Sequence, residues 1–316
     1  MANSPSAGRI VVATRDIPAL TPVLLDAALA AGPKLRSSLV CVECFTEIDS
    51  KHLVTCTKCG LPFCSARCQK LRRLHVAECG YVARSKRKLE VEELTAQDSV
   101  VLEAVTVLRL LHNEKAVRLL RLVDHLEDIK ATEDWQIFVS VATFIRERCS
   151  VEEFSEADIL HALGVLSSNA CNMAGFRARA LFPIYSLINH SCAANARNIV
   201  SSEDGTVEVL AQRDIRKGEE VTIRYTTNLL EGTKARRITL ASQWNFSCCC
   251  SRCLDNSPEG SMAGLVCFSC KKGVQLPSNP LDPCSPWACS CSATITAEEA
   301  ETRVDKVQNT LDKVPR

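Results

Sequence analysis

The sequence predicts an α+β fold, in which a β-rich domain is split by a cysteine block and a helical insert. Short apolar stretches typical of strands lie on both sides of these insertions, within 1–40 and 166–228. Between Tyr81 and Ala162 there is no proline or glycine, and valine and leucine recur at helical spacing. The chain also holds 19 cysteines, most of them in clusters. Because the strand-like segments flank the insertions, we expect them to form one interrupted domain.

The predicted strands are short. They are Ile10–Ala13, Val23–Leu25, Val207–Leu210 and Val221–Tyr225. A Glu-Asp-Gly turn signal at 203–205 precedes the third of them.

Helices are predicted in the insert and near the end of the chain. In the insert, Val101, Val105, Leu108 and His112 recur as one face of a helix requires. Several such helices would make 80–165 a helical bundle. Residues 296–314 predict one polar helix near the end of the chain.

Composition excludes several classes of protein. Of the 316 residues, 46% are hydrophobic and 24% are charged, which is typical of globular domains and excludes a disordered or collagenous chain. The net charge of +1 provides no overall field that would recruit nucleic acid or an acidic membrane. No apolar run approaches the ~18 residues of a membrane span, and no secretory leader opens the sequence. We therefore expect a monomer located in the nucleus and/or the cytoplasm, without a membrane partner.

The first cysteine block, 41–79, has the spacing of two interleaved zinc sites. Reduced, clustered cysteines in an intracellular chain indicate zinc rather than disulfides. A Cys-x2-Cys pair places both sulfurs on one ion, so the pairs are expected to alternate along the chain. The expected ligands are Cys41, Cys44, Cys64 and Cys68 for one ion, and Cys56, Cys59, His75 and Cys79 for the other. A block of this size cannot bury a sufficient core, and structural zinc can supply roughly 10 kcal/mol or more per site.

Two further cysteine blocks follow near the end of the chain. Cys248, Cys250 and Cys253 form one knuckle. The segment 256–292 has a ribbon-like pattern, for which the expected zinc ligands are Cys267, Cys270, Cys289 and Cys291, with Cys284 able to replace one of them. A ribbon without metal is the alternative for this last block. Cys149, Cys171 and Cys249 stand apart from all these sites.

A basic stretch overlaps the end of the first block. Residues 67–88 carry eight lysines and arginines against the single acid Glu78. Such a stretch predicts either a surface for DNA or an acidic partner, or a solvated helix face. Because aromatic residues are not interleaved with the charges, DNA contact is the weaker interpretation.

Three motifs follow one another in the second half of the chain, and their order is informative. They are Asn189-His190-Ser191-Cys192, the stretch from Gly218 to Tyr225, and Phe246-Ser247-Cys248 with its following cysteines. In this order they resemble the C-terminal half of a SET domain with its post-SET cysteines. The block at 41–79 resembles a MYND finger in all eight ligand positions. The whole stretch 8–292 therefore resembles the SET–MYND (SMYD-like) family. The likeness is closest to its arthropod SmydA/msta branch, judged from Gly8-Arg9, Ala13–Ile17, Gly32-Pro33, the helical insert and the last cysteine block.

The resemblance implies a domain organisation and an activity. The expected segments are 1–40 and 166–228 for the SET domain, 41–79 for the finger, 80–165 for the insert, 229–255 for the post-SET segment, 256–292 for the ribbon and 293–316 for a final helix. The implied activity is methylation of a lysine on a histone or non-histone protein with S-adenosylmethionine, in transcriptional regulation. The implied partner of the finger is a short proline-containing peptide.

The resemblance also assigns residues. It implies that Tyr225 is the catalytic tyrosine, which orients the lysine amine. The implied cofactor-binding residues are Arg9, Asn169, Asn189, His190, Tyr225 and Phe246. A helix end is the alternative role for Asn169. Cys192 is implied as the fourth ligand of a third zinc, together with Cys248, Cys250 and Cys253; the ribbon would hold a fourth zinc.

Three positions depart from the family pattern. Ile10 stands where a second glycine is usual, Ala19–Pro22 replaces a glycine turn, and Trp244 stands where many relatives have a second tyrosine. A β-branched residue cannot take glycine's positive φ at low cost, and tryptophan lacks the hydroxyl. These departures favour an alternative function: a catalytically weak or inactive SET–MYND protein that recruits partners as a scaffold or corepressor.

Overall fold

A computed structural model gives the fold of most of the chain. The described residues are 2–4, 8–34, 38–85, 87–95, 99–113, 122–175, 177–226, 230–258 and 264–311. They form two compact units. The first unit comprises Met1–Ile188 and Ala196–Glu220, and the second comprises Asn189–Asn195 and Val221–Arg316. The division falls inside the expected segment 166–228, which contributes to both units.

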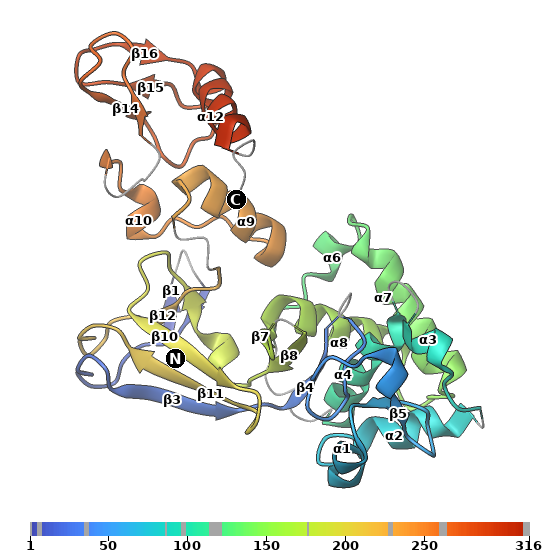
Figure 1. The fold of residues 1–316 in the computed structure, drawn as a ribbon. Helices are drawn as coiled ribbons and strands as arrows, with labels where there is room; N and C mark the ends of the chain where they lie inside the picture. Colours follow the sequence, from blue (N-terminus) through green and yellow to red (C-terminus); the bar gives the residue numbers. More distant parts are fainter. Residues whose placement is uncertain are drawn as a thin grey trace. The chain divides into compact units, whose positions relative to one another are not determined.

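The first unit contains an antiparallel sheet made from both ends of the interrupted domain. Its order is β10 (Ala196–Ser201), β11 (Thr206–Ala211) and β3 (Pro22–Ala27). The blue strand β3 and the yellow strands β10 and β11 lie side by side in Figure 1. Alternate residues of β11 are buried, as a strand with one covered face requires. The predicted α+β fold with an interrupted β domain is therefore confirmed.

A second sheet of this unit carries the insert. Strand β4 (Ala30–Pro33) pairs with β8 (Ala178–Leu181), which pairs with β7 (Cys171–Met173). Helix α4 (Val100–His112) packs on β4, and the Thr106 hydroxyl donates to the Pro33 carbonyl over 2.9 Å. A side chain at Gly32 would meet the Thr106 hydroxyl at 2.2 Å, so the helix approaches the strand closely only because position 32 is glycine.

Short elements make up the rest of the first unit. The N-terminal hairpin pairs β1 (Ala2–Ser4) with β2 (Gly8–Ile10). The finger holds η1 (Ser50–His52), β5 (Val54–Thr55), β6 (Pro62–Phe63), α1 (Ala66–Leu71) and α2 (Ala77–Val82). The insert continues with η2 (Ala83–Ser85), α3 (Val91–Thr95), α4, α6 (Leu126–Ile129), α7 (Asp134–Thr143), the short π-helix η3 (Phe144–Arg148) and α8 (Glu156–Asn169). A one-turn 3-10 helix, η4, spans Tyr185–Leu187.

Helix α4 is buried more completely than its sequence pattern predicts. Val101, Val105 and Leu108 are buried as expected, but so is every other residue from 101 to 111, while His112 is exposed. The helix is covered on all sides because it lies between strand β4, the finger and the other insert helices. One apolar cluster runs from Cys41 through the insert to Leu166 and Leu181. The finger therefore shares its core with the insert.

The second unit consists of smaller elements. Strand β9 (Asn189–His190) pairs in parallel with β12 (Thr222–Ile223), so the predicted strand 221–225 is two residues long. Helices α9 (Thr233–Trp244) and α10 (Ser251–Leu254) follow. The ribbon has four short strands: β13 (Leu265–Val266), β14 (Val274–Pro277), β15 (Trp287–Ala288) and β16 (Thr294–Ile295).

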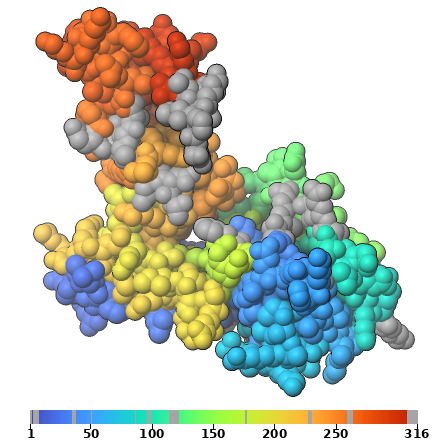
Figure 2. Space-filling model, in the orientation of Figure 1, coloured from blue at the N-terminus to red at the C-terminus, as the bar shows by residue number. Residues whose placement is uncertain are grey.

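The predicted C-terminal helix is α12 (Ala297–Leu311), and residues 312–314 of the prediction lie outside the described part. Its Arg303 lies over the Phe268 ring of the ribbon, and the two elements gather together in the orange and red part of Figure 2. No helix in the described part of the chain is both long and apolar enough to cross a membrane.

Candidate metal centres and aromatic site

The structure brings metal-ligating side chains together in four groups, with the ligand atoms of each group within 4.8 Å of one another. The first finger group is Cys41, Cys44, Cys64 and Cys68; the second finger group is Cys56, Cys59, His75 and Cys79; the Cys192 group is Cys192, Cys248, Cys250 and Cys253; the ribbon group is Cys267, Cys270, Cys289 and Cys291. These are the sets expected from the sequence, with the finger pairs interleaved. Cys284 and Cys249 are exposed and belong to no group among the described residues.

The spacing of the sulfurs fits zinc. Four thiolates at about 2.3 Å from one ion lie about 3.8 Å apart, whereas disulfide sulfurs lie about 2.05 Å apart. The Sγ–Sγ distance is 3.6 Å for Cys44–Cys64, 3.8 Å for Cys56–Cys79 and 3.7 Å for Cys267–Cys291. All 19 cysteines are free. Each group thus has the donor set and the dimensions of a structural zinc site.

The Cys192 group has a buried guanidinium beside it. Arg236 of α9 is fully buried, and its Nη2 lies 3.7 Å from the Cys253 sulfur while its Nη1 donates to the Glu231 carbonyl over 2.6 Å. Burial alone would lower the pKa of Arg236, but the contacts with Cys192 and Cys253 raise it. A zinc ion with four thiolates carries a net charge of −2, so this arginine offsets part of the charge. The sequence did not reveal Arg236, because no motif marks it.

His190 joins this group to Tyr225. Its Nε2 lies 3.3 Å from the Cys192 sulfur, and its Nδ1 accepts the backbone N–H of Tyr225 over 3.0 Å. Since Nδ1 is the acceptor, the proton is on Nε2 and points at the sulfur. The imidazole therefore holds the backbone of Tyr225 at a fixed place relative to the sulfur ligands.

Aromatic rings surround Tyr225. Its ring centroid lies 5.3 Å from that of His190, 5.5 Å from that of Trp244 and 6.3 Å from that of Phe246. The four rings are half-buried and pack on the Cys192 group. The Tyr225 ring thus lies among three other rings, beside four cysteines that could hold a metal ion. Such surroundings attract cations through the ring faces. Asn189, in β9, directly precedes His190.

The family of the chain is given by a comparison of its sequence with protein-family models. The model described as the SET domain matches residues 8–226. The chain belongs to the SET domain family. The match covers the interrupted β domain together with the finger and insert that split it, so the family resemblance drawn from the motifs is confirmed.

Individual proteins are also similar in sequence to this SET domain protein, in one case over nearly its whole length. SET domain-containing protein SmydA-8, isoform A, of Drosophila melanogaster is 29% identical over 325 residues, which cover 99% of this chain and 69% of that protein. N-lysine methyltransferase SMYD2-B of Danio rerio is 30% identical over 70% of this chain, and this chain spans 52% of its length. A crystal structure of the SET domain of LSMT bound to lysine and AdoHcy aligns with 77% of this chain and 51% of that one, at 17% identity and a TM-score of 0.34.

The remaining expected cofactor residues of this SET domain protein lie in the first unit. Asn169 is the last residue of α8, and its Nδ2 donates to the Val123 carbonyl over 2.7 Å and to the Val165 carbonyl over 2.9 Å. Its amide therefore fastens the end of the helix to the preceding segment. Arg9 is exposed in β2. The expected cofactor residues are thus divided between two units, and the role of Arg9 and Asn169 toward the cofactor stays a prediction.

The departures from the family pattern have different consequences. Ile10 pairs with Ala2 in the hairpin of β1 and β2 and has no positive φ, so it brings no backbone strain. Leu20, in contrast, has a φ of 63° at the turn where relatives have glycine, which costs ~1–2 kcal/mol for an L-residue. Trp244 keeps an aromatic wall beside Tyr225.

Four of the eight basic residues in the stretch 67–88 make side-chain contacts within the first unit. Arg73 lies 3.8 Å from the Glu43 carboxylate, and Arg84 and Arg87 form ion pairs with Glu153 and Glu93. The guanidinium of Arg72 donates to the Cys79 sulfur over 3.6 Å. The positive charges in these contacts are ones that a DNA-binding surface of the protein would need for phosphate groups.

Proposed function

We propose that this chain is an S-adenosylmethionine-dependent protein-lysine N-methyltransferase. The observation that carries the proposal is Tyr225, whose ring lies beside other aromatic rings and whose backbone N–H is held by His190 next to the Cys192 group. The SET domain match supports it, as does the similarity to SMYD2-B, which is named an N-lysine methyltransferase. The substrate is a protein lysine, of a histone or another protein.

The reaction moves a methyl group from a sulfonium to a neutral amine. A lysine with a pKa of about 10.4 must lose its proton first, and the amine, the methyl carbon and the sulfur must then lie in line. Tyr225 can orient the amine through its hydroxyl, while the rings of Trp244 and Phe246 exclude water. When bound, S-adenosylmethionine would supply the methyl group from its sulfonium, whose sulfur leaves as a neutral thioether while the positive charge passes to the amine.

The chain's own residues fit such a cofactor. Phe246 offers an apolar ring face on which an adenine can stack, and its ring centroid lies 5.9 Å from that of His190. Asn189 offers an amide group on the adjacent strand. Aromatic faces also favour a sulfonium cation. No metal takes part in the transfer itself; zinc would act by fixing the position of Tyr225.

Titration calorimetry and a methyl-transfer assay test the proposal on the same zinc-replete protein. We expect Asn189→Ala to lose S-adenosylmethionine binding. Tyr225→Phe should keep binding but lower the transfer rate 100-fold or more, which is typical for loss of a positioned acid–base group. The matched control is Tyr81→Phe, which removes the hydroxyl of a tyrosine in helix α2 of the first unit and should leave both binding and transfer unchanged. If the folded wild-type protein does not bind the cofactor, or Tyr225→Phe transfers methyl at the normal rate, the proposal is wrong.

The second candidate function is a partner-recruiting scaffold or corepressor. Trp244 favours it, because the ring beside Tyr225 has no second hydroxyl. In that case the finger would bind a short proline-containing peptide, and the pairing of the basic stretch favours a protein partner over DNA. Absence of cofactor binding in the folded protein would support this function. A location in the nucleus and/or cytoplasm suits both candidates.

A further inference from the structure

A buried carboxylate lies behind the histidine ligand of the second finger group. His75 Nδ1 lies 2.9 Å from the Glu78 carboxylate, and both side chains are fully buried. The other imidazole nitrogen, Nε2, faces the ligand side, 3.5 Å from the Cys59 sulfur. The carboxylate thus accepts a hydrogen bond from Nδ1–H, which leaves Nε2 unprotonated and able to ligate. Hydrogen-bonded carboxylates of this kind commonly fix the tautomer and ring orientation of a zinc ligand.

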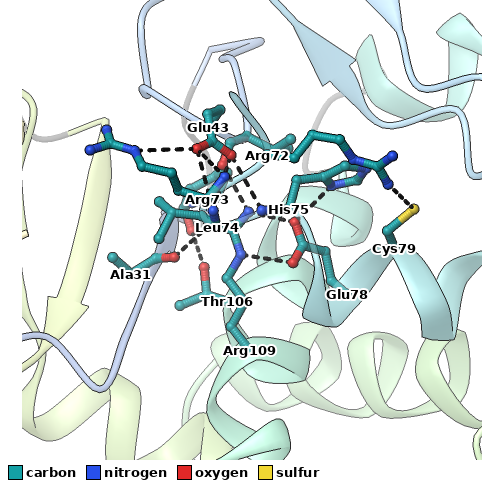
Figure 3. Close-up of polar contacts among 12 residues, drawn as sticks. Ala31, Glu43, Arg72, Arg73, Leu74, His75, Glu78, Cys79, Thr106 and Arg109 are labelled. Atoms are coloured by element: carbon teal, nitrogen blue, oxygen red, sulfur yellow. Dashed lines mark hydrogen bonds and ion pairs between the residues drawn. The ribbon is translucent and has the colours of Figure 1, made fainter. Parts of the chain in front are cut away.

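A buried arginine from the insert holds the carboxylate in turn. Arg109 of α4 forms a two-pronged ion pair with Glu78, in which its Nε donates over 3.0 Å and its Nη2 makes the second contact (Figure 3). The Glu78 carboxylate therefore lies between two donors, the guanidinium of Arg109 and the imidazole of His75.

The same guanidinium reaches two other segments. Its Nη1 donates to the Ala31 carbonyl of β4 over 2.7 Å, and its Nη2 donates to the Val42 carbonyl over 2.8 Å. Val42 lies between two ligands of the first finger group, Cys41 and Cys44. One side chain of the insert thus contacts the finger at two places and the split β domain at a third.

A second buried carboxylate fixes the backbone that leads to His75. Glu43 accepts the backbone N–H groups of Arg73, Leu74 and His75 over 2.8–3.3 Å. Figure 3 shows both carboxylates converging on this short segment from opposite sides. The ligand histidine is therefore held at its backbone by one finger residue and at its ring by a chain of contacts that ends in strand β4.

We propose that Glu78 and Arg109 are positioning residues that couple zinc binding at the second finger group to the order of strand β4. Zinc holds His75, His75 orients Glu78, and Glu78 orients the guanidinium that binds the Ala31 carbonyl. Because the coupling is reciprocal, loosening of the α4–β4 contact weakens the zinc site, and loss of zinc loosens β4. The inference does not depend on the methyltransferase proposal.

The structure offers a matched control for this coupling. Glu103 of α4 forms an equally buried ion pair with Arg179 of β8, in the same sheet as β4. Substitution of either pair removes one buried ion pair in which helix α4 supplies a partner. Only the Glu78–Arg109 pair contacts a zinc ligand.

A double-mutant cycle tests the proposal on the full zinc-loaded chain. The variants are Glu78→Gln, Arg109→Met and the double variant, with Glu103→Gln/Arg179→Met as the control. Zinc release to a chromophoric chelator and hydrogen exchange at residues 30–32 are measured on each. We expect one zinc equivalent to leave 10–100-fold faster in all three variants, the range usual for loss of an outer-shell partner, with faster exchange in β4.

The double variant separates coupling from mere stability. A lone buried charge can unfold either single variant, but the double variant leaves none, so it remains testable even if the singles do not fold. Its zinc release should stay fast, because an amide replaces the carboxylate behind His75. Zinc release at the wild-type rate in the double variant, or an equal acceleration in the Glu103–Arg179 control, would overturn the proposal.

Discussion

The second finger group and the ribbon group have four ligands each and begin with the same Cys-x2-Cys knuckle, yet their surroundings differ. All four ligands of the finger group are buried. In the ribbon group Cys291 is exposed and Cys270 is half-buried. The same local pattern of cysteines thus produces a centre inside a core in one region and a centre near the surface in the other.

The neighbours explain the difference. Around the finger group, Leu61 and Phe63 are fully buried, and the Phe63 ring meets the His75 ring edge-on with centroids 4.9 Å apart. In the ribbon, Val266 and Phe268 on the knuckle side are each 67% exposed. The finger's zinc site is therefore one part of a large apolar core, whereas in the ribbon the metal itself holds most of the structure together.

The largest expected effect comes from removing one ligand in each region. Cys59→Ser should loosen the whole core shared by the finger and insert, since a structural zinc is worth roughly 10 kcal/mol. Cys270→Ser should unfold the ribbon alone. The chain's three tryptophans allow a direct measurement, because Trp135 packs on the insert core and Trp287 lies in the ribbon. Single-tryptophan variants then report denaturation of each region separately.

The control is the same pair of measurements after brief treatment with a chelator. We expect the Trp287 signal to change first and the Trp135 signal last, in the order of ligand exposure. If Cys59→Ser leaves the Trp135 transition unchanged, the finger's zinc is not part of the shared core.

The ligand pairs of both regions could be predicted from sequence because they depend on short-range reach. A two-residue knuckle brings its sulfurs to one ion whatever the rest of the fold does, whereas the alternation of the finger pairs was an expectation that reach alone does not fix. The two-residue strands of the ribbon could not be predicted in this way, since a pairing that short has no periodicity to detect.

The charges behind the ligands were beyond prediction for another reason. Arg109 lies in a stretch whose sequence predicts a helix with one apolar face and with its charged residues exposed to solvent on the other face. Arg236 lies in a largely polar helix. Their burial is decided by which segments pack on the helix, information that is not local. Glu78 does leave a trace, three residues after His75 in the same turn, but its partner lies 31 residues further along.

A smaller effect is expected from the glycines that follow the two knuckles. Gly60, after Cys59, has a φ of +88°, and an added Cβ would lie 2.4 Å from the backbone oxygen of Leu89. Gly60→Ala should therefore lower the free energy of unfolding by about 2 kcal/mol or more, as measured from the Trp135 signal during denaturation. At Gly273 the added Cβ would instead meet the Cys289 sulfur at 2.6 Å.

The methyl group added in Gly273→Ala would thus displace a zinc ligand, Cys289, rather than backbone atoms. We expect faster zinc release from the ribbon, with the Trp135 transition unchanged. The comparison of the two regions would fail if Gly273→Ala shifted the Trp135 transition as much as Gly60→Ala does.

The smallest expected effect concerns the spare cysteine of the ribbon. Cys284 lies in the turn made by Asp282, whose carboxylate accepts its backbone N–H over 2.9 Å, and its side chain is exposed. Four sulfurs already complete the ribbon group without it. Cys284→Ser should therefore leave the zinc content and the release rates unchanged, as measured by elemental analysis and the chelator assay. With zinc in place, a thiol reagent should modify Cys284 and the exposed Cys249 first. Loss of one zinc equivalent in Cys284→Ser would instead show that Cys284 is a zinc ligand. The exposure of the ribbon centre would then result from an exchange of ligands, and not from the small number of apolar side chains around it.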